Sequence, residues 1–87
     1  MKVKVKFFAL IREKIDAREI NIEIKDGSTL GVLWEELKNS YLVLKNINSS
    51  LLFSVNHEYA SLDSLLKEGD EIALIPPVSG GGGYINV

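Results

Sequence analysis

The stretch "STLGVLWEELKNSY", residues 28–41, contains the one long helical pattern of the chain. Ser28 or Thr29 can cap its first turn, because a side-chain hydroxyl accepts a hydrogen bond from a backbone N–H group that has no partner within the helix. Apolar residues then recur at spacings of three and four, which places them on one face of a helix. They are Leu30, Leu33, Trp34, Leu37 and Tyr41. The pattern predicts an amphipathic helix with a single apolar stripe.

Two alternating stretches precede this helix. In "KVKVKF", residues 2–7, valine and phenylalanine alternate with lysine, which is the two-residue period of a half-buried strand. In "EINIEIKDG", residues 19–27, the isoleucines alternate in the same way through Ile24 and are followed by turn residues. The intervening "ALIREKIDA", residues 9–17, fits either a short helical turn or a broad loop.

Shorter strand patterns follow the helix. Residues 42–50 lose clear periodicity and are predicted to form a connection, and "LLFSVN", residues 51–56, is predicted to form a third strand. His57 and Glu58 fit a tight turn into a very short strand at residues 59–60. A last strand is predicted at residues 71–75, where Ile72 and Leu74 alternate with other apolar residues.

This order of elements predicts the α+β fold class. One helix lying across a mixed sheet of four or five strands satisfies it, and this arrangement is the ubiquitin-like β-grasp. A ferredoxin-like sandwich would need a second long amphipathic helix, which the pattern does not offer. We expect a β-grasp domain at residues 1–75 and a flexible tail rich in proline and glycine at residues 76–87.

The last strand is apolar on both faces. Ile72 and Leu74 point to one side of the sheet, and Ala73 and Ile75 point to the other. A single helix covers only one side. We therefore expect an exposed apolar patch near the start of the tail, and such patches mark surfaces for partners.

Composition excludes several classes of function. The 87 residues include no cysteine, so disulfides, thiolate metal sites and cysteine nucleophiles are absent. Residues 1–18 hold six basic and two acidic side chains, and the rest of the chain holds four and ten. This basic segment lacks the stacking aromatics and the arginine density of single-strand binders, so no nucleic acid is expected. The sequence contains no membrane-spanning or secretory pattern, and we expect a cytoplasmic protein.

His57 is the only histidine of the chain. No cysteine or second histidine accompanies it, so the sequence predicts a turn residue there and no metal site.

The tail "PPVSGGGGYINV", residues 76–87, has a different character from the domain. Pro76 and Pro77 donate no backbone hydrogen bond and favour an extended path, so they end the sheet. Glycines without Cβ atoms can pass through a narrow tunnel and let other groups approach the backbone closely. The segment from Pro76 to Gly81 extends roughly 20 Å at about 3.3 Å per residue. It is long enough to enter a deep pocket.

Three stretches carry a resemblance to a known family. They are "KVKFFALIRE" at residues 4–13, "SVNHEYAS" at 54–61 and, most specifically, "GDEIALIPPVSGG" at 69–81. Through them, residues 1–81 resemble the MoaD family of sulfur carriers, the small subunits of molybdopterin synthase, which are related to ThiS and ubiquitin.

The resemblance implies that the chain's own terminus is the reactive group. In MoaD-like proteins an E1-like enzyme that uses ATP and Mg adenylates the last glycine, here Gly81, which then becomes a thiocarboxylate. The tail next enters the large synthase subunit and gives its sulfur to a pterin precursor of the molybdenum or tungsten cofactor. The chain is then a noncatalytic subunit of a sulfurtransferase complex with no bound cofactor. The implied partner-contact residues are Phe7, Ile75, Pro76, Pro77, Val78, Ser79 and Gly80.

The sequence departs from the family pattern after Gly81, because "GGYINV" follows it. An internal glycine has an amide instead of a free carboxylate and cannot be adenylated. A protease can remove "GGYINV" to expose Gly81, or "YINV" to expose Gly83; the extension can be an artefact; or carrier activity is lost.

Two other functions remain open at this point. One is a ubiquitin-like carrier for thiamine or tRNA thiolation, or a protein modifier joined to lysines. The other is an interaction domain with an inert tail.

Overall fold

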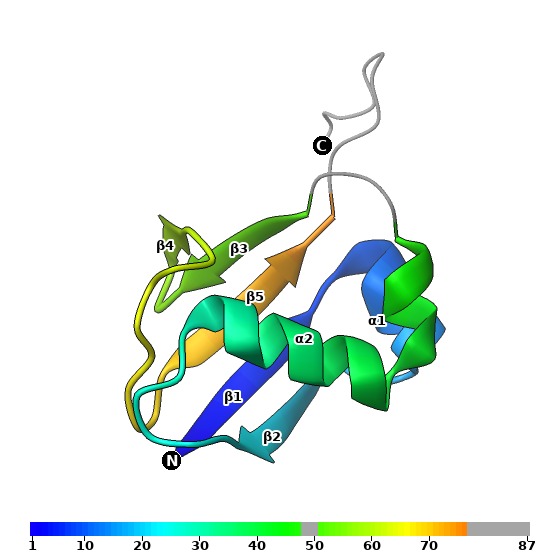
Figure 1. Ribbon diagram of the computed structural model, residues 1–87. Helices are drawn as coiled ribbons and strands as arrows, with labels where there is room; N and C mark the ends of the chain where they lie inside the picture. The colour runs from blue at the N-terminus through cyan, green and yellow to red at the C-terminus, as the bar shows by residue number, and fades with distance from the viewer. Residues whose placement is uncertain (48–50, 77–87) are drawn as a thin grey trace.

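Five strands form one mixed sheet in the order β2-β1-β5-β3-β4 (Figure 1). The computed structural model describes residues 1–47 and 51–76 of the chain. β1 pairs in parallel with β5, and the other neighbouring strands pair antiparallel. The strands are β1 (Lys2–Phe7), β2 (Glu19–Glu23), β3 (Leu52–Val55), β4 (Glu58–Ala60) and β5 (Glu71–Ile75).

Helix α2 (Leu30–Ser40) lies across one face of this sheet, as the sequence predicts (Figure 1). Of the two candidate caps, Thr29 is the N-cap, and its Oγ1 accepts a hydrogen bond from the Val32 N–H at 3.3 Å. Trp34 is half-buried and packs edge-on against Phe53, with 5.4 Å between ring centroids. The apolar stripe is fully buried at Leu30, Leu33 and Leu37. The β-grasp prediction is confirmed.

Two further segments are helical. The sequence pattern left one of them undecided and predicted the other as a connection. The first is α1 (Ala9–Ile15), which buries Ile11 and ends at Asp16. Asp16 has a φ of 64°, and its N–H donates to the Arg12 carbonyl at 2.8 Å, which closes the last turn. The second is a 3₁₀ helix, η1 (Leu42–Asn46), where a connection was expected. Residues 48–50 of that predicted connection lie outside the described residues.

β2 ends one residue before the alternation predicts. Ile24 lies beyond the strand but is still buried, and its N–H donates to the Met1 carbonyl at 2.9 Å. Ile20 and Ile22 are half-buried, because β2 is an edge strand of the sheet.

A two-residue turn joins β3 to β4. Asn56 and His57 have φ angles of 52° and 74°, as a type I′ hairpin requires at both central positions. The Asn56 side chain accepts from the Glu71 N–H at 3.0 Å and donates to Asp70 Oδ1 at 2.9 Å. Asp70 Oδ2 also accepts from the Lys67 N–H at 2.8 Å. This network fixes the turn beside the start of β5. His57 is a turn residue as predicted, but the prediction was wrong for its neighbours: Asn56, expected in the strand, is the other turn residue, and Glu58, expected in the turn, begins β4.

The two faces of β5 differ in what covers them. Ile72 and Leu74 are completely buried under α2, whereas Ile75 on the other face is only half-buried. No helix of the described segments covers that second face (Figure 1). We refer to it below as the open face. The apolar side of β5 expected near the start of the tail is therefore present, but its exposure is small there, because Ala73 is 9% exposed and Ile75 is half-buried.

Candidate functional site

The open face is divided into a charged half and an apolar half. On β1 and β2, residues of opposite charge are cross-strand neighbours: Lys6 lies opposite Glu19, and Lys2 lies opposite Glu23. Lys4 Nζ is 3.7 Å from Glu19 Oε2. Such solvated pairs contribute only about 0–1 kcal/mol to stability, but burying them under a partner would remove their hydration. A partner protein would therefore bind the charged half less favourably than the apolar half.

The register of four strands creates a hollow on the apolar half. Tyr59 lies opposite Ser54, Ser54 opposite Ala73, and Ala73 opposite Lys6, so these residues form one row across β4, β3, β5 and β1. The two central members of the row have small side chains, and the outer two have long ones. A depression results along β5.

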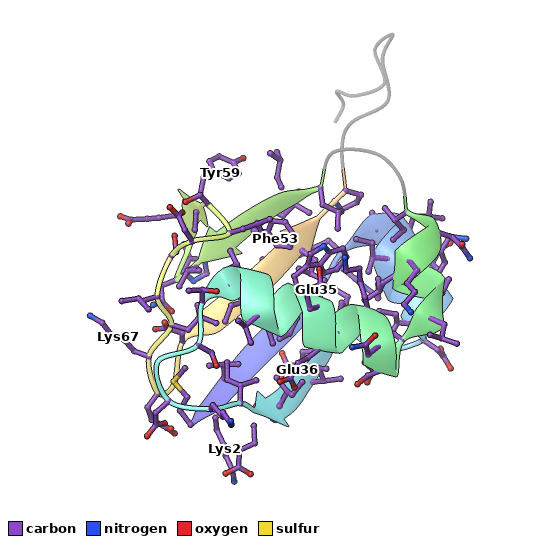
Figure 2. All side chains as sticks on the ribbon, viewed as in Figure 1. Lys2, Glu35, Glu36, Phe53, Tyr59 and Lys67 are labelled. Atoms are coloured by element: carbon purple, nitrogen blue, oxygen red, sulfur yellow. The ribbon has the colours of Figure 1, made fainter. Side chains whose placement is uncertain are left out.

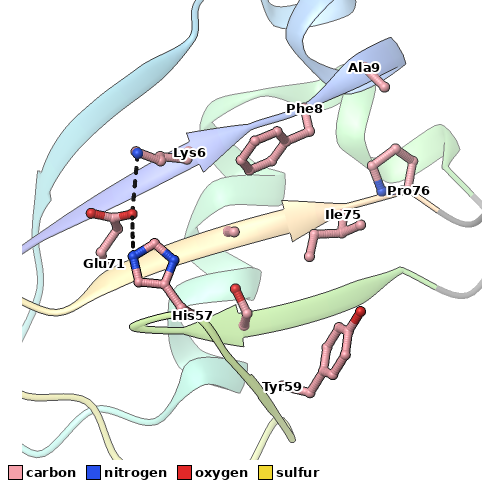
Figure 3. Close-up of a pocket in the computed structure, with 10 residues that line it drawn as sticks. Lys6, Phe8, Ala9, His57, Tyr59, Glu71, Ile75 and Pro76 are labelled. Carbon is pink, nitrogen blue, oxygen red and sulfur yellow. Dashed lines mark ion pairs between the residues drawn. The ribbon is translucent and has the colours of Figure 1, made fainter. Parts of the chain in front are cut away.

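This depression is a groove of about 510 Å³ (Figure 3). Ile75 and Ala73 line it from β5, Phe8 flanks it on the β1 side, and Tyr59 flanks it on the β4 side. The Phe8 side chain is 38% exposed, and Tyr59, which projects from the edge strand, is 75% exposed (Figure 2). The other lining residues are Lys6, Ala9, Ser54, His57, Glu71 and Pro76. Exposed aromatic rings around an apolar floor are typical of the centre of a protein interface.

The groove has one charged end and one apolar end. At the charged end, Glu71 Oε2 lies 3.2 Å from Lys6 Nζ and 3.7 Å from His57 Nε2 (Figure 3). At the other end are Ile75 and Pro76, where the described part of the domain ends. A molecule seated in the groove would therefore lie directly beside the origin of the tail.

Two of the predicted contact residues line this groove, and one does not. Ile75 and Pro76 are lining residues. Phe7 does not line the groove: it is 1% exposed, and its side chain packs edge-on against Tyr41, with 6.2 Å between ring centroids. A core side chain offers no surface to a partner unless the core opens. The remaining predicted positions, Pro77, Val78, Ser79, Gly80, Gly81 and Gly83, lie outside the described residues, as does the predicted flexible tail beyond Pro76.

The sequence reasoning missed the two aromatic residues that flank the groove. Phe8 follows directly after the last alternating residue of β1, and its extended backbone, with a φ of −125°, continues the alternation onto the open face. Tyr59 belonged to a strand that the sequence predicted, but the register across β3 was needed to place it over the groove. Extending the alternation of β1 by one residue would have found Phe8.

The described residues form a surface suited to binding a partner, and they do not form a metal site. Within residues 1–47 and 51–76, no cluster of three or more histidine, aspartate and glutamate side chains has the geometry to hold a metal ion. None of the helices in these segments is long and apolar enough to cross a membrane. The feature that stands out is an apolar groove with a charged end, next to the point where the tail begins.

Comparison with known proteins shows which family the chain resembles. The model of the ThiS family matches residues 5–81. The molybdopterin synthase sulfur carrier subunit of Chlamydomonas reinhardtii is 35% identical over 83 residues, which cover 93% of this chain and 100% of that protein.

Solved structures agree with the sequence match. The small archaeal modifier protein 1 (SAMP1) of Methanosarcina acetivorans has a TM-score of 0.80 and 30% identity, with 92% of this chain and 96% of that chain covered. Subunit 1 in a protein–protein complex of subunits 1 and 2 of the molybdopterin-converting factor of Helicobacter pylori has a TM-score of 0.67 and 29% identity, covering 93% and 100%. The resemblance drawn from the sequence is confirmed: the chain belongs to the ThiS family.

Proposed function

We propose that this protein is the sulfur carrier subunit of a molybdopterin synthase. In this role its terminal glycine carries sulfur as a thiocarboxylate to a pterin precursor of the molybdenum or tungsten cofactor. The relatives named as sulfur carrier subunits support the proposal at the level of sequence. The observation that carries it is the position of the groove, whose apolar end at Ile75 and Pro76 is where β5 ends and the stretch "PPVSGG" begins in the sequence.

This position suits a carrier whose chemistry takes place in another protein. The groove gives a partner an apolar surface to hold, and Pro76, which donates no backbone hydrogen bond, follows the last residue of β5 at its apolar end. Six residues from Pro76 to Gly81 reach roughly 20 Å at about 3.3 Å each. A partner seated on the groove can therefore receive the terminal glycine in a pocket well away from the domain. The large synthase subunit is the proposed partner, in line with the two-subunit complex of the Helicobacter pylori relative.

The carrier needs activation before it can accept sulfur. A terminal carboxylate has a pKa of about 3.5, so it is ionised at neutral pH and is a poor electrophile. An E1-like partner that uses ATP and Mg would let this carboxylate attack the α-phosphorus of ATP, which releases pyrophosphate and forms an acyl adenylate. Hydrosulfide from a sulfur donor then attacks the acyl carbon, AMP leaves with the bonding electron pair, and the product is the thiocarboxylate. These groups come from the partner, and the chain itself supplies only the docking surface and the carboxylate.

We propose that hydrolysis of the Gly81–Gly82 peptide bond precedes this activation. The family match ends at residue 81, and the Chlamydomonas protein is covered to its full length by 93% of this chain. The six residues "GGYINV" follow Gly81. Removal of them by a peptidase frees the carboxylate that the adenylation step requires. Cleavage after Gly83 is the alternative, and the end of the family match favours Gly81.

Intact-mass analysis tests the proposal. Chains ending at Gly81, at Gly83 and at Val87 are each incubated with the activating enzyme, ATP and a sulfur donor. Exchange of one carboxyl oxygen for sulfur adds roughly 16 Da, and we expect this shift for the chain ending at Gly81 but not for the chain ending at Val87. A mass shift for the chain ending at Gly83 alone would indicate that cleavage takes place after Gly83 instead of after Gly81. The absence of any shift would contradict the carrier role.

Protein modification is a second candidate, favoured by the 0.80 TM-score to the small archaeal modifier protein of Methanosarcina acetivorans. Both roles begin with the same acyl adenylate, and they differ in the nucleophile that follows. Lysine conjugates of the chain ending at Gly81, found in native extracts by mass spectrometry of branched peptides, would support the modifier role.

A further inference from the structure

A second recess adjoins the groove on the β1 side. It has a volume of about 190 Å³ and shares Lys6 and Phe8 with the groove, so the two hollows form one continuous surface. The other residues that line it are Phe7, Arg12, Arg18 and Glu19. The apolar groove therefore continues past the Phe8 ring into a region that contains two guanidinium groups.

The backbone of Phe7 binds the side chain of Arg12 and the main chain of Arg18 at this recess. The Arg12 Nε–H donates to the Phe7 carbonyl at 3.4 Å, and the Phe7 N–H donates to the Arg18 carbonyl at 2.9 Å. The bond at Nε leaves the terminal N–H groups of Arg12 available. A guanidinium oriented in this way is prepared to donate two parallel hydrogen bonds to a carboxylate.

The other charged groups of the recess are already paired. Lys6 Nζ lies 3.2 Å from Glu71 Oε2, and Glu19 Oε2 lies 3.7 Å from Lys4 Nζ. Within the described residues, neither Arg12 nor Arg18 forms an ion pair. This holds even though Glu13 and Asp16 line a neighbouring recess together with the two arginines. Within the part of the chain that the structure describes, these two arginines are thus the charged residues of the recess that form no ion pair.

We propose that this recess is an anion subsite of the docking surface, in which Arg12 and Arg18 bind a carboxylate side chain of the partner protein. The partner segment that fits the combined surface is apolar where it covers Ala73 and Ile75, with an aspartate or glutamate next to it on the β1 side of Phe8. Arginine is enriched in interfaces because its planar fork matches a carboxylate and its stem packs against apolar surface. The inference rests on the proposed function only for the identity of the partner, the large synthase subunit.

The experiment measures the affinity of the chain ending at Gly81 for the large synthase subunit encoded by the same genome. Titration calorimetry compares the wild-type chain with Arg12→Gln/Arg18→Gln at ionic strengths of about 50 mM and about 300 mM. We expect the double variant to bind about tenfold more weakly at the lower ionic strength and to lose most of the salt dependence of the wild type. Arg12→Lys/Arg18→Lys keeps the charges without the fork, so we expect a loss of about threefold.

Lys25→Gln is the matched control, because it removes one positive charge from an exposed position outside the groove and the recess. We expect its affinity to stay within about twofold of the wild type, since screening removes most of the effect of a distant charge. Thermal unfolding of each variant shows whether it is folded. If the double glutamine variant is folded and binds like the wild type at both ionic strengths, the inference is overturned.

Two further results separate this inference from the proposed function. Ile75→Asp places a charge in the groove itself and is expected to abolish binding. If it does so while the arginine variants bind normally, the docking surface stands without the anion subsite. If the wild-type chain does not bind the large subunit, the proposed function and the inference both fail. A single-stranded oligonucleotide that binds through the two arginines, with unchanged affinity for the large subunit, would assign the recess to nucleic acid and overturn the inference.

Discussion

Phe7 and Phe8 are consecutive residues whose side chains lie on opposite sides of the sheet. The Phe7 ring is 1% exposed and contacts Tyr41 in the core, whereas the Phe8 ring is 38% exposed and flanks the groove. Of these two neighbouring residues, Phe7 therefore contributes to the core that stabilises the domain, and Phe8 contributes to the docking surface.

We expect alanine substitutions at these two positions to affect different measurements. Phe7→Ala should lower the free energy of unfolding by about 3–5 kcal/mol, because it removes a buried ring and leaves a cavity. Phe8→Ala should lower it by less than about 1.5 kcal/mol but weaken partner binding at least about tenfold, as loss of a central aromatic residue does in other interfaces. Urea unfolding and titration calorimetry measure the two quantities. A larger binding loss in a folded Phe7→Ala variant than in Phe8→Ala would contradict the assignment.

The small side chain of Ala73 keeps the groove open, so a large side chain there should close it. We expect Ala73→Phe to fold, since the side chain points to the open face, and to weaken binding of the large subunit by at least about tenfold, because the ring occupies the space of the partner. Asn21→Phe is the control: it places the same ring on the charged half of that face, opposite Lys4. Equal effects of the two substitutions on affinity would show that the partner does not use the groove.

The hydrogen bond between Asn56 and Asp70 should stabilise the hairpin that carries Tyr59. Asp70 is 8% exposed, and its carboxylate accepts from the Asn56 amide and from the Lys67 N–H. Asp70→Ala leaves these donors unpaired, and we expect a loss of about 1–3 kcal/mol in the free energy of unfolding. Asn56→Gly removes the side chain but permits the positive φ, and a double-mutant cycle should give a coupling energy of about 1 kcal/mol. A coupling energy near zero would mean that the two side chains act independently.

Gly31 should not tolerate alanine, although glycine in a helix is normally a weak point. A Cβ atom at Gly31 would lie 3.1 Å from the Leu62 carbonyl oxygen, and that oxygen also accepts the Gly31 N–H at 2.7 Å. The carbonyl can make room for the Cβ atom only by a shift that lengthens this hydrogen bond. We expect Gly31→Ala to destabilise the domain by about 0.5–1 kcal/mol, in place of the gain of about 1 kcal/mol that helix propensity alone gives. A higher unfolding midpoint for the variant would contradict this.

The sequence predicted those elements whose pattern is long or whose boundaries are marked by turn residues. The stripe from Leu30 to Leu37 and the strand at residues 71–75 lie where the pattern placed them. α1 was left undecided because a helix of seven residues presents only two turns of pattern, and its buried residue is Ile11 alone. Periodicity could not distinguish that helix from a loop.

The candidate site was predicted less completely, because a surface depends on strand register. The apolar outer face of β5 could be read from Ala73 and Ile75, but the row that joins Ala73 to Tyr59 depends on pairing across β3. Likewise, the resemblance implied a contact at Phe7, whereas the alternation of β1, extended by one residue, places Phe8 on the open face.

The central claim is that the chain carries sulfur on a newly exposed glycine carboxyl group. The most direct test is the intact mass of the mature protein isolated, without reductive or acid treatment, from the cell in which it naturally occurs. We predict a chain that ends at Gly81, with a fraction that is heavier by roughly 16 Da, the difference between sulfur and oxygen in the activated acyl group. Mature protein that retains Val87 in cells that actively make the cofactor would contradict the account.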